Sequence, residues 1–225
     1  MVKDKAKITE IFSSIQGEGL YVGQAQTFVR FHGCNINCSF CDEARKNQFR
    51  EYSAQELIEA IIRENNKVVS LTGGEPLLYS GFLKEVLPRL KKRGFVIYLE
   101  TNGTLKNKLL EIIDFLDIIS MDIKLPSSTG IRAYWKAHAD FLKEAVRKKV
   151  FVKSVITDKT SVSDIKRAVS VIKGVDKGIF FILQPATINN RIQKIKSAGR
   201  FLDMANSTLN NVRLIPQVHR ILGLR

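Results

Sequence analysis

The sequence has few cysteines, few prolines and no long hydrophobic run. Only three of its 225 residues are cysteine, five are proline and one is tryptophan. No apolar run approaches the roughly 18 residues that a membrane helix needs, which excludes a membrane-embedded protein. The first twelve residues carry charges throughout, so we expect no signal peptide. Because an odd number of cysteines cannot all pair in disulfides, we expect a reducing, cytoplasmic location.

The chain also has fewer acidic than basic residues. The chain has 36 lysines and arginines against 22 aspartates and glutamates, a net charge of +14. Such a balance predicts an anionic partner, either nucleic acid or small anionic ligands. The basic residues are dispersed, and the short clusters at 89–94 and 146–150 lie at predicted helix ends, where cations favour the helix dipole. This distribution does not favour a nucleic-acid partner.

Predicted strands and helices alternate along the chain, which indicates a parallel sheet built of βαβ units. We expect a single domain over residues 1–225 with an α/β fold, a partial, open βα barrel of about six parallel strands. Ser53 and Glu56 predict a capping box at the start of one helix, and Gly94 predicts the end of the next. The predicted strands are 26–31, 67–72, 95–100, 117–122, 150–156, 178–185 and 212–216; the predicted helices are 53–65, 80–94, 107–116, 131–149, 161–174 and 191–206.

Polar residues and turn-formers follow the predicted strands. In parallel α/β folds the active site lies at the carboxyl ends of the strands, so these segments are the candidate site. They are the cysteine loop after the first strand, TGGEP (72–76), ETNG (100–103), MDIKLP (121–126), QP (184–185) and PQVH (216–219).

All three cysteines lie within eight residues, at Cys34, Cys38 and Cys41. The spacing differs from that of zinc sites, which pair Cys-x2–4-Cys with two further ligands. His32 is either a fourth ligand or, as we expect for a residue at a strand edge, a packed histidine. Three thiolates suit a four-iron cluster with one open iron, where a small molecule can bind.

The cysteine spacing, with Phe40 before the last cysteine and GGEP at 73–76, resembles the signature of the radical S-adenosylmethionine (SAM) superfamily. The resemblance implies that the open iron binds SAM and that the reduced cluster cleaves it to methionine and a 5′-deoxyadenosyl radical. It also implies that Gly73 and Gly74 let the backbone approach the methionine, and that Glu75 pairs with its ammonium group.

Residues 12–42 and 212–225 resemble the two ends of 7-carboxy-7-deazaguanine synthases. This narrower resemblance implies conversion of 6-carboxy-5,6,7,8-tetrahydropterin to 7-carboxy-7-deazaguanine with loss of ammonia, a step toward queuosine or archaeosine. It implies catalytic use of SAM, a requirement for Mg²⁺, an electron donor such as a flavodoxin or ferredoxin, and a homodimer.

The family's functional residues have counterparts here. Arg30 would pair with the substrate carboxylate, for which a bidentate guanidinium is suited, or it makes an ordinary salt bridge at the strand edge. The turn around Gly17 would bind the pterin edge or is a tight surface turn, and His219 contacts substrate or only packs. The implied substrate site comprises Ile15, Gln16, Gly17, Glu18, Arg30, Thr72 and His219. The implied SAM site comprises Phe40, Asp42, Gly73, Gly74, Glu75, Asn102, Asp122, Lys124 and Gln184.

Two departures from the family pattern concern ligands. Where the family usually has Cys-Asp-Thr, with the threonine as Mg²⁺ ligand, this chain has Cys41-Asp42-Glu43. A carboxylate also suits Mg²⁺, so Glu43 is the candidate ligand, or it faces solvent. Residues 121–128 replace a shorter Ser-Pro-Lys, and Lys124 takes the place of that lysine.

Two other functions fit some of these features. A radical SAM activase that acts on a glycine of a partner protein would share the cysteine and GGEP motifs, but would not need the segments at 14–19 and 216–223. A non-enzymatic module with a structural zinc that binds RNA would account for the basic charge.

Overall fold

A computed structural model describes residues 5–39, 41, 48–188 and 191–224, so the predicted residues Phe40, Asp42 and Glu43 lie outside the described part of the chain. The strands are β1 (Ala6–Ile15), β2 (Ala25–Phe31), β3 (Arg50–Tyr52), β4 (Val68–Gly73), β5 (Val96–Thr101), β6 (Ile118–Asp122), β7 (Lys149–Ile156), β8 (Phe181–Pro185), β9 (Thr187–Ile188), β10 (Arg191–Ile192) and β11 (Val212–Leu214). The α-helices are α1 (Ala54–Arg63), α2 (Ser80–Lys92), α3 (Lys106–Leu110), α4 (Pro126–Thr129), α5 (Trp135–Ala145), α6 (Val162–Lys173), α7 (Ala198–Asn206) and α8 (Val218–Ile221).

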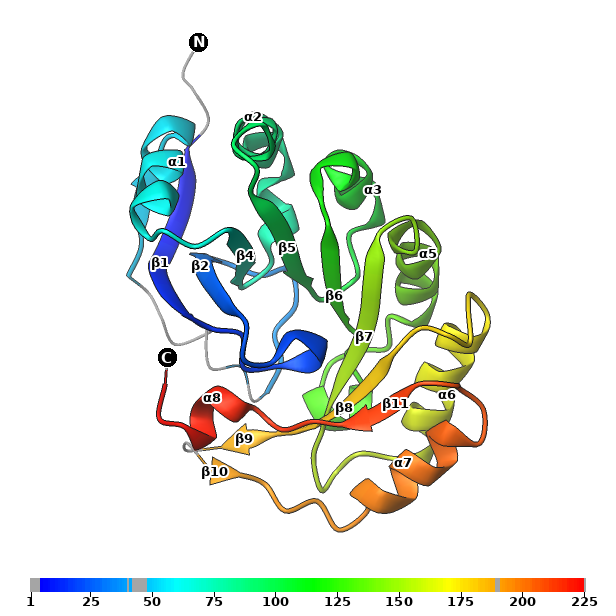
Figure 1. Ribbon diagram of the computed structural model, residues 1–225. Coiled ribbons are helices and arrows are strands. Elements are labelled where there is room, and N and C mark those ends of the chain that lie inside the picture. The colour runs from blue at the N-terminus through cyan, green and yellow to red at the C-terminus, as the bar shows by residue number, and fades with distance from the viewer. Residues whose placement is uncertain (1–4, 40, 42–47, 189–190, 225) are drawn as a thin grey trace.

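Nine of the described strands form one sheet in the order β11-β8-β7-β6-β5-β4-β2-β1-β3, and β9 and β10 form a separate two-stranded sheet. Every neighbouring pair from β2 to β11 is parallel, while β1 pairs antiparallel with both β2 and β3. The sheet curls into an open barrel with α1, α2, α3, α5, α6 and α7 on its outer side (Figure 1). The predicted α/β fold, a partial βα barrel, is confirmed, with seven parallel strands where about six were expected.

Several predicted element boundaries were wrong. The strand β1 was not predicted, because its charged and polar residues mask a weak alternation in which Ala6, Ile8 and Phe12 are buried. Helix 191–206 begins only at Ala198, since Arg191–Ile192 pairs with β9 in a hairpin. Helix 131–149 is confined to α5, and Lys149 already belongs to β7.

The segment predicted as helix 107–116 is broken into α3 and a 3-10 turn at Ile113–Phe115.

Other local predictions are confirmed. Ser53 accepts the backbone N–H of Glu56, and the Glu56 carboxylate accepts the backbone N–H of Ser53, which is the reciprocal capping box. Gly94 follows α2 with φ +76°, the left-handed conformation that ends many helices at glycine.

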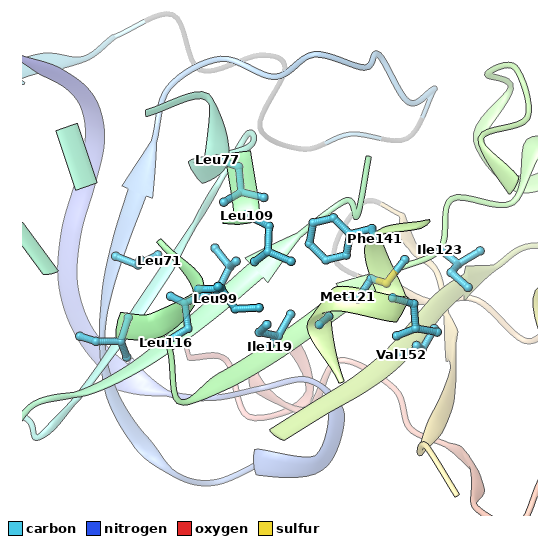
Figure 2. Packing of buried hydrophobic residues seen from close by; sticks show 14 of the residues in the cluster. Leu71, Leu77, Leu99, Leu109, Leu116, Ile119, Met121, Ile123, Phe141 and Val152 are labelled. Atoms are coloured by element: carbon cyan, nitrogen blue, oxygen red, sulfur yellow. The ribbon is translucent and has the colours of Figure 1, made fainter. Parts of the chain in front are cut away.

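The sheet has a helix-facing side and an inward side, and successive residues of a strand alternate between them. Figure 2 shows Leu71, Leu99 and Ile119 of the strands among side chains from the helices, including Phe141 of α5. All are buried in the main hydrophobic core. None of the described helices is long and apolar enough to cross a membrane.

The inward side has an apolar cluster near the amino ends of the strands. There a second cluster packs against Leu20 and Tyr21, and its buried members are Val68, Tyr98, Ile118, Phe151 and Ile182. Each comes from a different one of the neighbouring strands β4 to β8. This cluster fills the inside of the barrel at one end, so only the carboxyl ends of the strands can surround a cavity.

Candidate functional site

A cavity of about 420 Å³ lies at the carboxyl ends of the strands. Inward-facing positions near the ends of β4 to β8 supply five of its lining residues, Thr72, Glu100, Asp122, Lys153 and Gln184. Each lies two or four residues after the apolar inward residue of its own strand, as the two-residue period of a strand requires. The same strands therefore contribute an apolar floor and, above it, polar side chains that line the cavity.

The structure brings most of the predicted site residues together around this one cavity. Those that line it are Ile15, Gln16, Gly17, Glu18, Arg30, Cys34, Cys38, Cys41, Thr72, Gly73, Gly74, Asn102, Asp122, Lys124, Gln184 and His219. These residues come from segments that are far apart in the sequence, from Ile15 near one end to His219 near the other. The clustering at strand ends is therefore a property of the fold.

The GGEP turn is joined directly to the cysteine loop. The backbone N–H of Gly74 donates to the Phe31 carbonyl at 2.9 Å, and that of Glu75 donates to the Gly33 carbonyl at 2.9 Å. A Cβ at Gly74 would lie 1.8 Å from the Gly33 carbonyl oxygen. Glycine is therefore required where these two backbones meet, one residue before Cys34.

The part of the cavity that Cys34, Cys38 and Cys41 line suits an iron–sulfur cluster. Burial raises the pKa of the Cys34 thiol above its usual value, and it raises that of Cys38 to about 11. Iron must therefore displace protons from neutral thiols. Among the described residues, no three His, Cys, Asp or Glu side chains converge closely enough to hold one metal ion. In a four-iron cluster each thiolate binds a different iron, which requires no such convergence.

His32 packs on Phe49, with ring centroids 4.7 Å apart, as expected for a packed histidine.

Glu75 does not face the cavity, in contrast to the predicted pairing with a ligand ammonium. It is fully buried, and its carboxylate accepts hydrogen bonds from the backbone N–H groups of Leu77 (3.1 Å) and Asn102 (2.8 Å) and from the Thr101 hydroxyl (2.9 Å). Burial raises its pKa to about 7. Glu75 connects the GGEP turn to the ETNG turn behind the cavity wall.

Arg30 and Glu100 also line the cavity. Arg30 Nε donates to Glu10 Oε2 of the adjacent strand β1 at 3.2 Å, so the salt bridge considered from the sequence is present while Arg30 also lines the cavity. The Glu100 carboxylate accepts from Gln16 Nε2 at 2.9 Å and from the Thr72 hydroxyl at 2.6 Å. These contacts orient a carboxylate and a guanidinium toward the same space.

Four residues of alternating charge, Lys124, Asp122, Lys153 and Glu18, form a continuous series of ion pairs along the cavity wall. Asp122 Oδ2 lies 2.9 Å from Lys124 Nζ and 3.3 Å from Lys153 Nζ, and Lys153 Nζ lies 2.5 Å from Glu18 Oε2. Gln217 Nε2, from the C-terminal segment, donates to Glu18 Oε1 at 2.5 Å. Burial acts to raise the pKa of Glu18, but Lys153 and Gln217 together hold it at about 2. Burial acts to lower the pKa of Lys153, but the charges of Glu18 and Asp122 raise it. Despite burial, the pKa of Asp122 lies below its usual value and that of Lys124 above it, so the whole series is ionised at neutral pH.

Lys153→Met is expected to lower the free energy of unfolding at pH 7 by about 3–5 kcal/mol, because it leaves the Glu18 carboxylate without its cation and Asp122 with Lys124 alone. The wild-type contribution of Glu18 is present above its unfolded pKa of about 4.5 and is lost as the pH falls toward 2. Urea denaturation between pH 7 and 3 measures both effects, with the exposed Lys149→Met on the same strand as control. Equal losses in the two variants would contradict the assigned role of Lys153.

Two buried oxygens on the cavity wall have no hydrogen-bond partner among the described residues. They are Asp122 Oδ1 and Gln184 Oε1, on residues that are 5% and 2% exposed. Unsatisfied buried acceptors are costly, so both indicate a ligand with hydroxyl or amino donors. The ribose and amino groups of SAM are such donors, and these residues therefore fit the predicted cofactor.

Sequence reasoning placed Glu100 and Gln217 in candidate segments without giving them a role, and it missed the lining residues Glu10, Phe12, Lys153 and Arg220. A signal for Glu100 and Lys153 was present, since each occupies an inward position of its strand, two residues after Tyr98 and Phe151. The others come from β1 and the C-terminal segment, whose approach to the barrel end depends on tertiary contacts. Val218, for instance, donates its backbone N–H to the Gly17 carbonyl at 2.9 Å.

Comparison with known proteins identifies the family of this chain. Residues 28–157 match the radical SAM superfamily. A 7-carboxy-7-deazaguanine synthase from Geobacter sulfurreducens is 36% identical over 249 aligned residues, which cover 99% of this chain and 99% of the relative. This chain belongs to the 7-carboxy-7-deazaguanine synthase family. A synthase of the same name from Methanopyrus kandleri is 33% identical and covers 96% of this chain and 92% of its own.

A solved structure shares the fold of this chain. The crystal structure of QueE from Escherichia coli superposes with a TM-score of 0.69 over 96% of this chain and 95% of that chain, at 22% identity. At this identity the likeness concerns the fold alone. The four-iron cluster and SAM are the cofactors of this family, and the three cysteines and the glycine turn fit them.

Proposed function

We propose that this protein converts 6-carboxy-5,6,7,8-tetrahydropterin to 7-carboxy-7-deazaguanine with loss of ammonia. The observation that carries the proposal is that the three cysteines, Arg30 and Glu100 all line one cavity. A carboxylated pterin offers an anion for the guanidinium and N–H groups for the carboxylate. The chain also spans nearly the full length of the named synthases to which it is similar.

In this proposal, the residues of the chain bind and orient the substrate and SAM. Arg30 pairs with the substrate carboxylate, and its salt bridge to Glu10 limits the directions in which the guanidinium can point. Gln16 and Thr72 hold the Glu100 carboxylate at the substrate. Asp122 and Gln184 bind SAM, which supplies a 5′-deoxyadenosyl radical when the cluster is reduced.

Three further parts of the proposal rest on the family resemblance. Mg²⁺ assists binding of the substrate, with the Glu43 carboxylate in place of the family's threonine hydroxyl. A flavodoxin or ferredoxin reduces the cluster, and the chain acts as a homodimer of single-domain subunits. Comparing the Mg²⁺ dependence of the wild type with that of Glu43→Thr tests the ligand assignment, because identical dependences would remove Glu43 from the site.

Arg30→Gln is expected to weaken binding of 6-carboxytetrahydropterin by about 10- to 100-fold, since a charge-assisted pair is lost. Binding of a tetrahydropterin without the carboxylate should change little. Calorimetric titration under anaerobic conditions measures both affinities, with Arg63→Gln on the exposed side of α1 as the control. If the wild type bound both pterins equally, the proposed pairing and the substrate assignment would both be wrong.

The two other functions make different predictions. A glycyl-radical activase would co-purify with a large partner and would form 5′-deoxyadenosine only in its presence. A structural zinc module would contain zinc without iron or sulfide and would bind RNA tightly and with strong salt dependence. Metal analysis of the purified protein separates the zinc module from both radical enzymes.

A further inference from the structure

Asn102 makes hydrogen bonds at each of its polar atoms. This residue follows β5 and is 5% exposed. Its backbone N–H donates to Glu75 Oε2 at 2.8 Å, and its carbonyl oxygen is 3.1 Å from His138 Nε2. Its side-chain Oδ1 accepts from the backbone N–H of Thr104 at 3.1 Å and from the Thr104 hydroxyl at 2.6 Å. Both the backbone and the side chain of Asn102 therefore have a defined position.

The contacts also fix the orientation of the amide group. A backbone N–H can only donate, so the atom facing Thr104 must be the amide oxygen. The amide nitrogen then faces the cysteine loop, where it lies 2.9 Å from Asn35 Oδ1 and 3.7 Å from Cys34 Sγ. Because the amide has two N–H groups, it can donate to both atoms, and the second N–H reaches the sulfur.

His138 supports this arrangement from outside the cavity. It lies on α5 and is fully buried, and burial lowers its pKa to about 4, so the ring is neutral at pH 7. Since the Asn102 carbonyl only accepts, the proton of the neutral ring lies on Nε2. The ring therefore donates to the turn that carries Asn102.

We propose that Asn102 donates a hydrogen bond to the Cys34 thiolate of the bound cluster and thereby raises its reduction potential, with His138 as a positioning residue. A hydrogen bond withdraws charge from the sulfur and stabilises the reduced cluster, which is the more negative form. The inference rests on the iron–sulfur cluster of the proposed function and is independent of the pterin substrate. Iron analysis tests the first and a pterin turnover assay the second, so each can fail separately.

The test is a redox titration of the anaerobically reconstituted protein, followed by electron paramagnetic resonance. Asn102→Asp replaces the donor with a carboxylate of similar shape, so we expect a lower midpoint potential than in the wild type. A roughly tenfold less favourable reduction corresponds to a shift of about 59 mV for one electron. The control is Asn107→Asp, which adds the same charge at an exposed position of α3 and should leave the potential unchanged.

An iron-loaded Asn102→Asp protein with the wild-type potential would overturn the proposal. If that variant loads no iron, Asn102→Ala and Asn102→Ser take its place, because both lack the amide donor. His138→Phe provides an independent measurement, since His138 does not line the cavity. We expect a smaller lowering of the potential in this variant, and an unchanged potential would exclude the positioning role.

Discussion

Replacing any one of the three cysteines with alanine is expected to reduce SAM cleavage to background. The cluster has only three protein ligands, since the fourth iron must remain open for SAM, so the loss of one thiolate leaves a two-ligand site. Cys34, Cys38 and Cys41 all line the same cavity, and the chain has no other cysteine that could replace them. Iron and sulfide content and the release of 5′-deoxyadenosine measure the effect.

The control for this experiment is the folded state of the apoprotein. Burial raises the pKa of the Cys34 and Cys38 thiols, so these side chains are neutral before iron binds, and alanine should be tolerated by the fold. We expect the thermal unfolding of wild-type and variant apoproteins to be similar. A variant that keeps its iron and cleaves SAM at the wild-type rate would contradict the assignment of that cysteine.

Gly74→Ala is expected to lower the rate of turnover by about 100-fold or more. The added Cβ would lie 1.8 Å from the Gly33 carbonyl oxygen and 3.2 Å from the backbone nitrogen of Cys34. Both are backbone atoms, so the cysteine loop must move by roughly 1 Å, and a misplacement of about that size can cost about 100-fold in rate. The change would also strain the hydrogen bond from Glu75 N–H to the same carbonyl.

Gly81→Ala is the matched control, because the space around Gly81 is open and this residue lies within α2. Alanine is a better helix former than glycine, so this variant should be as stable as the wild type or slightly more stable. Steady-state turnover and iron content are measured for both variants. Turnover of Gly74→Ala at the level of Gly81→Ala would show that the close approach of the two turns is not required.

The sequence was sufficient to predict the parallel α/β barrel and the end at which the site lies. Both follow from short-range patterns, namely apolar runs separated by helices and polar turns after each run. The same patterns concealed β1, whose strand character depends on pairing with β2 and β3 on either side. They also concealed the pairing of β9 with β10, because the residues of β10 were predicted to begin a helix.

Within the site, sequence motifs predicted many of the residues that line the cavity. They did not predict the contacts that those residues make with distant parts of the chain. Glu75 belongs to a motif, but its hydrogen-bond partners Thr101 and Asn102 are 26 and 27 residues away. Its role in connecting the two turns could therefore not be predicted from the motif's spacing. Lys153 lies 135 residues from Glu18, and neither residue alone indicates a buried ion pair. Counting alternate positions upward from the buried Phe151 would have placed Lys153 on the inward face.

The most direct test of the proposed function is anaerobic turnover of the reconstituted wild-type protein with 6-carboxytetrahydropterin, SAM and a reductant. Products are identified and counted by mass spectrometry against samples that lack SAM or the reductant. We predict that 7-carboxy-7-deazaguanine forms only in the complete mixture and in excess over the SAM consumed. Accumulation of 5′-deoxyadenosine and methionine without 7-carboxy-7-deazaguanine would contradict the account.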